Sequence, residues 1–250
     1  MASCAPSFHS AIPEKEGTFT ELESLFVERE GAFQSIQAMV NLSVKSISGT
    51  RQNITGILSF HQGGKVRFLG FDPLGRTVMD LTAVNDHFQI SVAGEPPLKG
   101  SLTRDKIIPL RVGSGETDLI NVNSWLSTLH ELRWGGTPLP REDEILLIDK
   151  EGETLLCSII EVKGKEAVLR RRVWLERAFF RPIKEEIYIE SSSGKRFLSG
   201  SLFFENFKGE NSGAWPGRMK AFLEDGEYQV EFLETNFSPI FSSDYFQIEK

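Results

Sequence analysis

The stretch that decides the fold is KVRFLGFDPLGRTVMDL, residues 65–81. Two short runs of strand-like composition, residues 66–71 and 77–84, flank the tetrapeptide Asp72-Pro73-Leu74-Gly75. Proline presets the backbone angle of the second turn position, and glycine adopts the exit geometry that other residues resist. The stretch therefore predicts two antiparallel strands joined by a tight turn.

Leu74 stands out because it occupies the tip of that turn. Turns of this kind normally carry polar residues at the tip, whereas Leu74 places a large apolar side chain there. Two interpretations follow from the pattern alone: a partly buried turn leucine, or an apolar contact offered to something outside the domain.

Further strands are predicted on both sides of this hairpin, because apolar and polar residues alternate there with a period of two. The first series comprises residues 40–44, 54–60, 66–71, 77–84 and 88–92. The second series comprises residues 145–148, 155–162, 167–177, 183–190, 195–207, 218–224, 227–234 and 245–248. Pairs such as Gly63-Gly64 and Asp225-Gly226 mark hairpin turns between them. Residues 95–113 stay ambiguous because Pro96, Pro97 and Pro109 interrupt any long strand.

Two amphipathic helices are predicted beside these strands. The first begins near Thr18, where apolar residues recur at a spacing near 3.6 and glutamates lie on the other side. The second covers about residues 117–133 and ends at Gly135-Gly136. A long antiparallel sheet curls because strand twist accumulates. We therefore expect a mainly β (α+β) fold: a single curled antiparallel sheet forming a half-open barrel of about 11–13 strands, with two helices covering its concave face.

The chain is predicted to form one domain, residues 18–250, preceded by a flexible tether, residues 1–17. The net charge of −7 argues against nucleic-acid binding, which needs a basic footprint. Arg170, Arg171 and Arg172 alternate between two strand faces, and we interpret them as a solvated strand face rather than an anion site. Cys157 lies in an apolar run and is expected to be an inert buried thiol.

No catalytic or metal-binding motif emerges from the sequence. The four histidines are isolated, and no pair has the spacing of helical metal ligands. Gly113-Ser114-Gly115 lacks the strand-to-helix frame of a nucleophile elbow. We expect no enzyme activity, no cofactor and no metal.

The run F-x-x-F-D-P-L-G-R-T, preceded by G-x-L-x-F, resembles the LolA/LolB group of bacterial envelope lipoprotein carriers. The outer-membrane receptor member carries a turn of the form N-P-L-G whose exposed leucine enters the membrane. Pro73, Leu74 and Gly75 match this turn, and Asp72 stands where the asparagine would. The resemblance implies that Leu74 contacts the membrane, and that the concave face and the helices enclose an apolar cavity for the acyl chains of lipoproteins or lipids.

The candidate cavity residues are those whose strand face points toward the predicted concavity: Phe60, Phe68, Met79, Leu81, Leu169, Val173, Val230 and Phe232. The candidate lid residues share the apolar faces of the two helices: Leu22, Phe26, Phe33, Trp125, Leu126 and Leu129. Ordinary core packing is the alternative for all of them.

The first four residues, Met-Ala-Ser-Cys, resemble the end of a bacterial lipobox whose signal peptide is truncated. Cys4 is therefore the expected lipid-attachment site, and Ala5 in the next position favours the outer membrane, with the domain facing the periplasm. The resemblance implies a monomer that binds acyl chains and the membrane surface, and that takes its cargo from a periplasmic carrier protein. The alternative function is a non-catalytic structural or interaction lipoprotein with a filled core, in which Leu74 contacts a protein partner.

Overall fold

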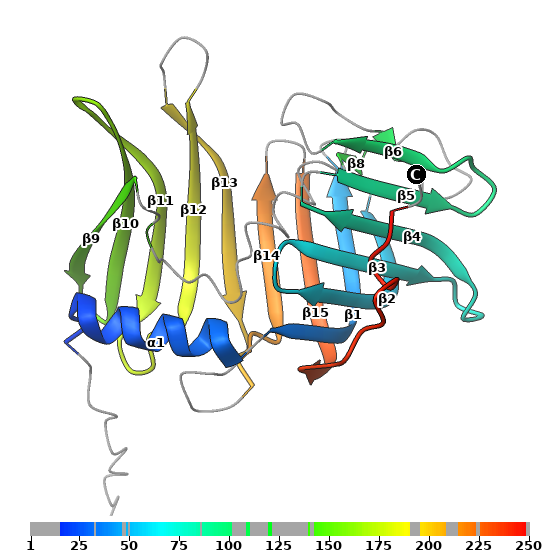
Figure 1. Cartoon of the computed structure of the whole chain (residues 1–250), viewed down its shortest axis with the longest axis horizontal. Helices are drawn as coiled ribbons and strands as arrows, with labels where there is room; N and C mark the ends of the chain where they lie inside the picture. Colours follow the sequence, from blue (N-terminus) through cyan, green and yellow to red (C-terminus); the bar gives the residue numbers. More distant parts are fainter. Residues whose placement is uncertain are drawn as a thin grey trace, which may run out of the picture.

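The computed structural model describes residues 16–32, 34–46, 49, 51–85, 87–101, 109–110, 120–121, 140, 143–190, 196–208, 215–223 and 226–248. These residues form one helix, α1 (Phe19–Ala32), and strands in two sheets (Figure 1). The first half of the large sheet comprises β1 (Ser35–Ser46), β2 (Arg51–His61), β3 (Lys65–Phe71), β4 (Thr77–Val84), β5 (His87–Val92) and β6 (Leu98–Ser101). Its second half comprises β9 (Glu144–Glu151), β10 (Thr154–Lys163), β11 (Glu166–Glu176), β12 (Pro182–Glu190), β13 (Arg196–Glu205), β14 (Arg218–Leu223) and β15 (Gly226–Phe237).

The large sheet has 13 strands in the order β6-β5-β4-β3-β2-β1-β15-β14-β13-β12-β11-β10-β9. All neighbours in each half follow one another in the chain, and the antiparallel pair β1–β15 joins the two halves. The direction of the strands turns steadily across the sheet, so that β2–β6 run across the view while β9–β13 run along it (Figure 1). The described sheet is curled, and its edge strands β6 and β9 do not pair with each other.

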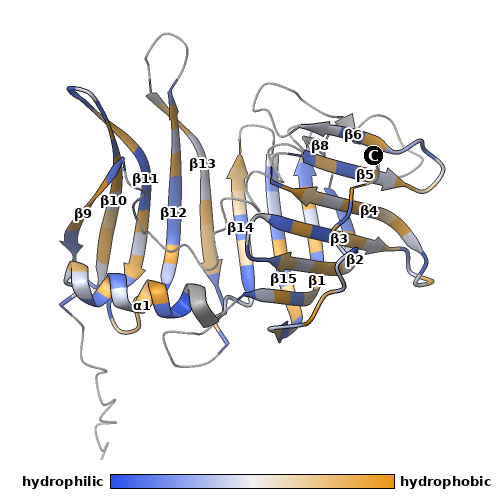
Figure 2. Ribbon diagram, viewed as in Figure 1, coloured by the Kyte–Doolittle hydropathy of each residue, from blue (hydrophilic) through white to orange (hydrophobic). Residues whose placement is uncertain are grey.

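Hydrophobic and hydrophilic residues alternate along many of the strands (Figure 2), and the buried hydrophobic ones give the sheet one apolar face. On β1, for example, Ile36, Ala38 and Val40 are buried, whereas Met39 between them is exposed. The large cluster is a set of buried side chains on this concave face: Ile36, Ala38, Val40, Leu42, Val44, Leu58, Phe60, Val66, Phe68, Met79, Leu81, Ala83, Phe88, Ile90, Leu202, Phe204, Trp215, Met219, Ala221, Tyr228, Val230 and Phe232.

Helix α1 begins with a capping box. The Thr18 backbone amide donates to Glu21 Oε2 at 2.9 Å, and the Glu21 amide points back at Thr18 Oγ1 at 3.4 Å. The helix lies across β9–β13 near one end of these strands (Figure 1). Its buried residues belong to a second group of side chains, the helix-covered cluster: Leu22, Phe26, Leu155, Cys157, Val173, Leu175 and Phe180.

The strand predictions correspond to β1–β5 and β9–β15, and β6 completes the 13-stranded sheet. Of the two predicted helices, only the first is found, because α1 is the single helix among the described residues. Within the range predicted as the second helix, Ile120–Asn121 form strand β8, which pairs with β7 (Pro109–Leu110) in a two-stranded sheet. Strand β8 forms because it pairs with a segment ten residues earlier, and the spacing of apolar residues within 117–133 gives no information about that pairing. The rest of the predicted helix lies outside the described residues.

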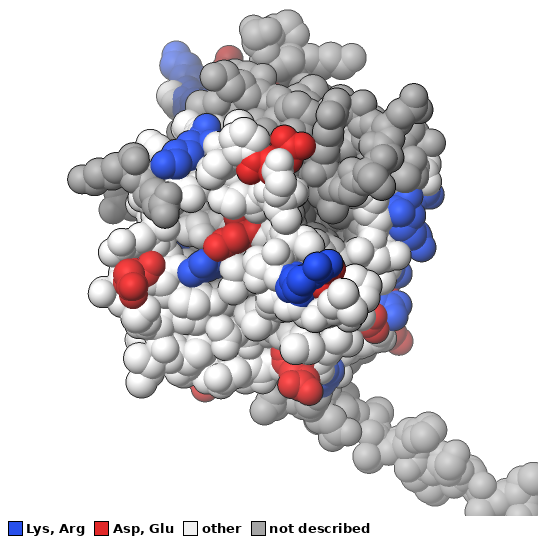
Figure 3. All heavy atoms as spheres, turned by 90° about the vertical axis from the view of Figure 1, so that its right-hand side faces the viewer, with Lys and Arg blue, Asp and Glu red and all other residues white. Residues whose placement is uncertain are grey.

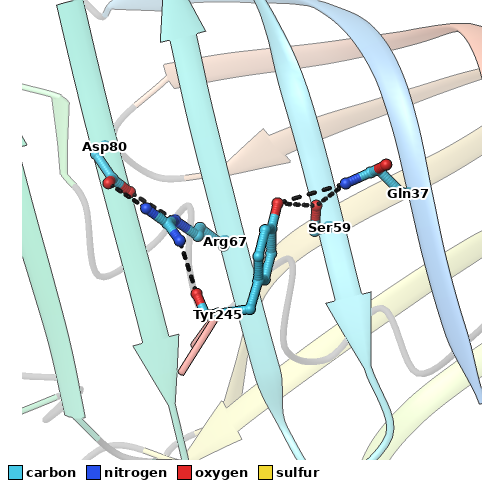
Figure 4. A network of polar contacts seen from close by, with 5 residues as sticks. All are labelled: Gln37, Ser59, Arg67, Asp80 and Tyr245. Atoms are coloured by element: carbon cyan, nitrogen blue, oxygen red, sulfur yellow. Dashed lines mark hydrogen bonds and ion pairs between the residues drawn. The ribbon is translucent and has the colours of Figure 1, made fainter. Parts of the chain in front are cut away.

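The prediction of a strand at residues 245–248 is wrong, because Tyr245 and Phe246 lie in a turn and residues 247–248 form no strand. Tyr245 lies over β1–β3, with its hydroxyl 3.0 Å from Ser59 Oγ (Figure 4). Arg67 donates from Nη1 to the Tyr245 carbonyl at 2.7 Å and from Nε to Asp80 Oδ1 at 3.0 Å. Gln37, Ser59 and Arg67 alternate along their strands with residues of the large cluster, so this network holds the C-terminal segment on the face opposite to that cluster.

Candidate functional site

The concave face brings together most of the candidate cavity residues. Six of them belong to the large cluster: Phe60, Phe68, Met79, Leu81, Val230 and Phe232. Val173 belongs to the helix-covered cluster instead. These side chains come from β2, β3, β4, β11 and β15, so the curled sheet gathers positions that lie far apart in the sequence.

Leu169 is the one candidate cavity residue that lies outside both clusters. A bulge in the β10–β11 pairing puts Arg171 opposite Ile159 but Leu169 opposite Ile160, so Arg170 is an extra residue on β11. The bulge breaks the alternation on which the prediction depended. Val168 is buried, whereas Leu169 is only half-buried.

Of the candidate lid residues, Leu22 and Phe26 are fully buried against strands β10 and β11. Phe33, Trp125, Leu126 and Leu129 lie outside the described residues, as does Cys4. Arg29, one turn after Phe26, was not singled out from the sequence. Its Nη1 and Nη2 each donate at 3.0 Å, to the carbonyls of Phe180 and Phe179.

Arg29 is buried and carries its charge against the turn between β11 and β12. Burial, together with the positive charge of Arg181, lowers the pKa of Arg29 to about 10. Arg29 is therefore charged at neutral pH, and both of its terminal nitrogens bind backbone oxygens of one turn. Phe180 adopts a positive φ of 54° there, which few residues other than glycine do. The helix thus fixes this turn as well as covering the sheet.

Close packing characterises the concave face. Gly56 and Gly70 are paired neighbours on β2 and β3, and the ring of Phe68 lies over both. A Cβ atom added at Gly56 would come within 2.7 Å of the Phe68 ring and 2.3 Å of the Leu69 carbonyl oxygen. The large cluster as a whole is closed to solvent in this structure, since all of its members are buried.

The Asp72–Gly75 turn has a defined geometry. The Gly75 amide donates to the Asp72 carbonyl at 2.9 Å, and Gly75 has a φ of 78°, which glycine tolerates best. Asp72 Oδ1 accepts from the amides of both Leu74 and Arg76 at 2.9 Å. Asp72 Oδ2 accepts from Arg76 Nε at 2.7 Å. Asp72 therefore holds the turn from inside.

Leu74 is 79% exposed at this tip. The interpretation of a partly buried turn leucine therefore does not describe the structure. The turn lies at the end of the molecule away from α1 (Figure 1). Most of the described surface on that side is uncharged, and several of its acidic and basic side chains lie next to each other (Figure 3). Leu74 is thus exposed on a turn that Asp72 fixes by hydrogen bonds, on a side of the molecule that carries few charges.

The outer face of the second half of the sheet is polar and aromatic. Lys184 Nζ lies 4.4 Å from the centre of the Trp174 ring and donates to Glu186 Oε1 at 2.6 Å. Tyr188 donates to the other oxygen of Glu186. Phe203 meets Phe222 edge to face. The contrast with the apolar concave face gives the sheet two chemically distinct sides.

Cys157 is buried in the helix-covered cluster as a free thiol, and burial raises its pKa to about 12. Within the described residues, no three His, Cys, Asp or Glu side chains gather as metal ligands would. No described helix has the length and apolar character needed to cross a bilayer.

No family model and no curated protein sequence matches the chain. Solved structures with the same fold match nearly its whole length. A LolA superfamily protein from Nitrosomonas europaea superposes with a TM-score of 0.55 at 12% identity, covering 91% of this chain and 97% of that one. A putative outer membrane lipoprotein-sorting protein domain from Vibrio parahaemolyticus gives 0.54 at 14% identity, covering 90% and 95%. A DUF1329 family protein from Desulfovibrio piger gives 0.58 at 11% identity, covering 91% and 96%.

Proposed function

We propose that this chain, which has the fold of the LolA superfamily, is a lipid- or lipoprotein-binding protein of the bacterial cell envelope. It accepts acyl chains against the concave face of its sheet and delivers them to or from the outer membrane. The name of the Vibrio protein, a lipoprotein-sorting domain, supports lipoprotein as one class of cargo. No catalytic step is part of this function.

The observation that carries the proposal is the largely apolar concave face of a sheet that does not close into a barrel. The large cluster draws side chains from β1–β5 and β13–β15 on that single face. Each acyl methylene moved from water into such an environment contributes about 0.8 kcal/mol. A few buried acyl chains would therefore supply ample affinity, and release needs a competing apolar phase, which the membrane provides.

The Asp72–Gly75 turn supports delivery at a membrane. Pro73, Leu74 and Gly75 form an exposed turn, and Leu74 enters the membrane interface, where its burial contributes about 1.5–3 kcal/mol. Acylation of Cys4, in the N-terminal segment of residues 1–17, would tether the domain, residues 18–250, to that membrane. One lipid chain gives only marginal membrane attachment, whereas two or more chains anchor a protein stably. A protein anchored through an acylated Cys4 would therefore act as a receptor and not as a shuttle. As a monomer facing the periplasm, it would take its cargo from a periplasmic carrier.

The exclusion of solvent from the concave face favours a second candidate function. The members of the large cluster are all buried, as in a filled core. In that case the protein is a structural or interaction lipoprotein, and Leu74 contacts a protein partner. Acyl chains could enter only if side chains of the large cluster, Phe68 among them, moved apart.

Native mass spectrometry of the full chain, purified from a bacterial host without detergent, tests the two functions against each other. The proposal predicts adducts with the mass of phospholipids or acylated peptides, which organic extraction removes. Uptake of an added fluorescent fatty acid by the extracted protein gives the matching positive result. A single clean mass with no uptake would favour the filled core.

A further inference from the structure

Strand β9 is one edge of the 13-stranded sheet, and it pairs along its whole length with β10 but with no other described strand. Its pairing with β10 is regular, without a bulge, and the strand contains no proline. The other edge strand, β6, has only four residues and follows Pro96 and Pro97. Short length, prolines and bulges are features that keep an edge strand from pairing with another chain. Among the described strands, β9 therefore forms the open edge of this sheet.

The open side of β9 carries the backbone groups of alternate residues. The Val162 amide donates to the Asp143 carbonyl at 2.9 Å, so these facing residues form a hydrogen-bonded pair directly beyond the β9–β10 ladder. Hydrogen-bonded and non-hydrogen-bonded pairs alternate along an antiparallel ladder. The residues whose amides and carbonyls point away from β10 are therefore Glu144, Leu146, Ile148 and Lys150.

Two apolar side chains lie half exposed beside this edge. Ile145 is 47% exposed and Leu147 is 49% exposed. They alternate with Leu146 and Ile148, which pack against the helix-covered cluster, so they lie on the outer face of the sheet. A long, regular edge strand with exposed apolar side chains is a template for pairing with a further strand.

The sequence of β9 is complementary to itself when two copies run antiparallel with Leu147 at the two-fold axis. Glu144 of each copy then lies opposite Lys150 of the other, and Leu146 lies opposite Ile148. All backbone groups on the open side of β9 find partners in this register. On the outer face, the two copies of Leu147 lie opposite each other. The edge therefore matches a second copy of itself in backbone hydrogen bonds, in charge and in apolar side chains.

We propose that β9 pairs with β9 of a second copy of this chain, so that the two sheets join across a two-fold axis. Opposite charges that face each other across two strands stabilise their pairing, and like charges destabilise it. Lys150 forms an ion pair with Glu16 of its own chain, and the two side chains are 52% and 71% exposed. Exchanging this exposed ion pair for one with Glu144 of the second copy costs little, since such pairs contribute little to stability.

This inference goes beyond the proposed function and leaves its unit intact. Strand β9 takes no part in the large cluster or in the Asp72–Gly75 turn, so each paired chain keeps both features. A contact through one pair of strands is small beside a standard protein–protein interface of about 1,600 Å². The pair therefore separates on dilution, and the single chain remains the unit that binds cargo.

Analytical ultracentrifugation of the full chain without detergent, over a range of concentrations, tests the pairing. We expect the mass to rise from 28.1 kDa toward twice that value as the concentration increases. Leu147→Lys should raise the Kd of the dimer about tenfold or more, because it places two lysines opposite each other at the two-fold axis. Val162→Lys is the matched control: Val162 is 45% exposed on β10, away from the edge, so this variant should pair like the unaltered chain.

Charge reversal tests the register. Glu144→Lys places lysine opposite lysine at both ends of the paired strands, and Lys150→Glu places glutamate opposite glutamate. Each variant alone should therefore have a Kd about tenfold or more above that of the unaltered chain. An equimolar mixture of the two variants restores opposite charges in both pairs and should form a mixed dimer. A purely structural role of either residue in its own chain would not give this rescue.

A single mass at every concentration of the unaltered chain would overturn the inference. A dimer that Leu147→Lys leaves intact would overturn it as well, because the contact would then lie on another surface. The same holds for a mixture of the two charge variants that stays monomeric. These outcomes do not depend on acyl binding, so they leave the proposed function to its own test.

Discussion

Asp72 fixes the conformation of the turn that exposes Leu74. The backbone amide of Arg76 is the main cause that lowers the pKa of Asp72, and the Arg76 side chain and the Leu74 amide add to it. A carboxyl whose pKa is lower in the folded state contributes to the turn above its ordinary pKa, near 3.9, and loses this contribution only as the pH falls through the lowered value. The turn should therefore keep its geometry throughout the neutral and mildly acidic range.

Leu74→Glu separates folding from delivery. Because Leu74 is exposed, the free energy of unfolding should change by no more than about 0.5 kcal/mol. Transfer of a fluorescent acyl lipid from the protein to phospholipid vesicles should slow about tenfold or more, because a charge replaces the apolar contact with the interface. Stopped-flow fluorescence measures the transfer, and urea unfolding measures the stability.

Val27→Glu is the matched control for Leu74. Val27 is 58% exposed on α1, which lies at the other end of the molecule, so its replacement should leave transfer unchanged. Unaltered transfer by Leu74→Glu, or equal slowing by both variants, would show that membrane insertion of Leu74 has no part in delivery.

The position of Arg171 on the apolar face could have been predicted from the sequence, but its partner could not. Alternation counted back from Val173 places Arg171 on the apolar side of β11, and the same count from Ile187 places Glu185 there. The pattern was present in the sequence, but three consecutive arginines suggested a solvated face. The ion-pair partner that makes the interior position tolerable, Glu185, lies on another strand, and a single sequence does not name it.

At the scale of elements, α1 depends on Arg29 as much as on its apolar stripe. Arg29→Met removes the donors to the carbonyls of Phe179 and Phe180 and leaves both oxygens without them. We expect a loss of about 2–4 kcal/mol in the free energy of unfolding, because each of the two oxygens left without its donor costs about 1–3 kcal/mol. Arg29→Lys should lose less, because an ammonium can still bind one carbonyl.

Urea unfolding followed by circular dichroism measures both Arg29 variants, with Glu23→Ala as the control. Glu23 is exposed on the same helix, so its replacement should leave stability within about 0.5 kcal/mol. A stable Arg29→Met protein would mean that the apolar contacts of Leu22 and Phe26 alone hold the helix on the sheet.

Elements were predictable from the sequence where their signals are local. The strands β1–β5 and β9–β15 follow from alternation and glycine turns, and the start of α1 near Thr18 follows from the helical period. The β11 bulge, the β7–β8 pair and the C-terminal segment depend on contacts between distant segments. Tyr245 illustrates the last case, since its partners Ser59 and Arg67 lie almost two hundred residues earlier.

At the scale of the whole molecule, the two faces of one sheet differ in chemical character. Its outer face carries ion pairs, cation–π contacts and the C-terminal segment, whereas its concave face carries the two apolar clusters and the Arg171–Glu185 pair. Pairing of β1 with β15 makes the two halves a single surface. Since the concave face is closed to solvent, uptake of an acyl chain requires a rearrangement of the side chains that pack there.

Tryptophan positions allow the central claim, that acyl chains bind the concave face, to be tested directly. Trp215 belongs to the large cluster, with its ring centre 5.6 Å from that of Phe232. Trp174 lies on the other face over Lys184. Two variants that each keep one of these residues, with the other three tryptophans replaced by phenylalanine, report on the two faces separately.

The decisive measurement is quenching of each variant by a fatty acid brominated along its chain. Acyl binding in the interior predicts strong quenching of Trp215 and little change at Trp174, with reversal when an unbrominated acid competes. Quenching of Trp174 alone, equal quenching of both, or quenching of neither would contradict an acyl-binding concave face.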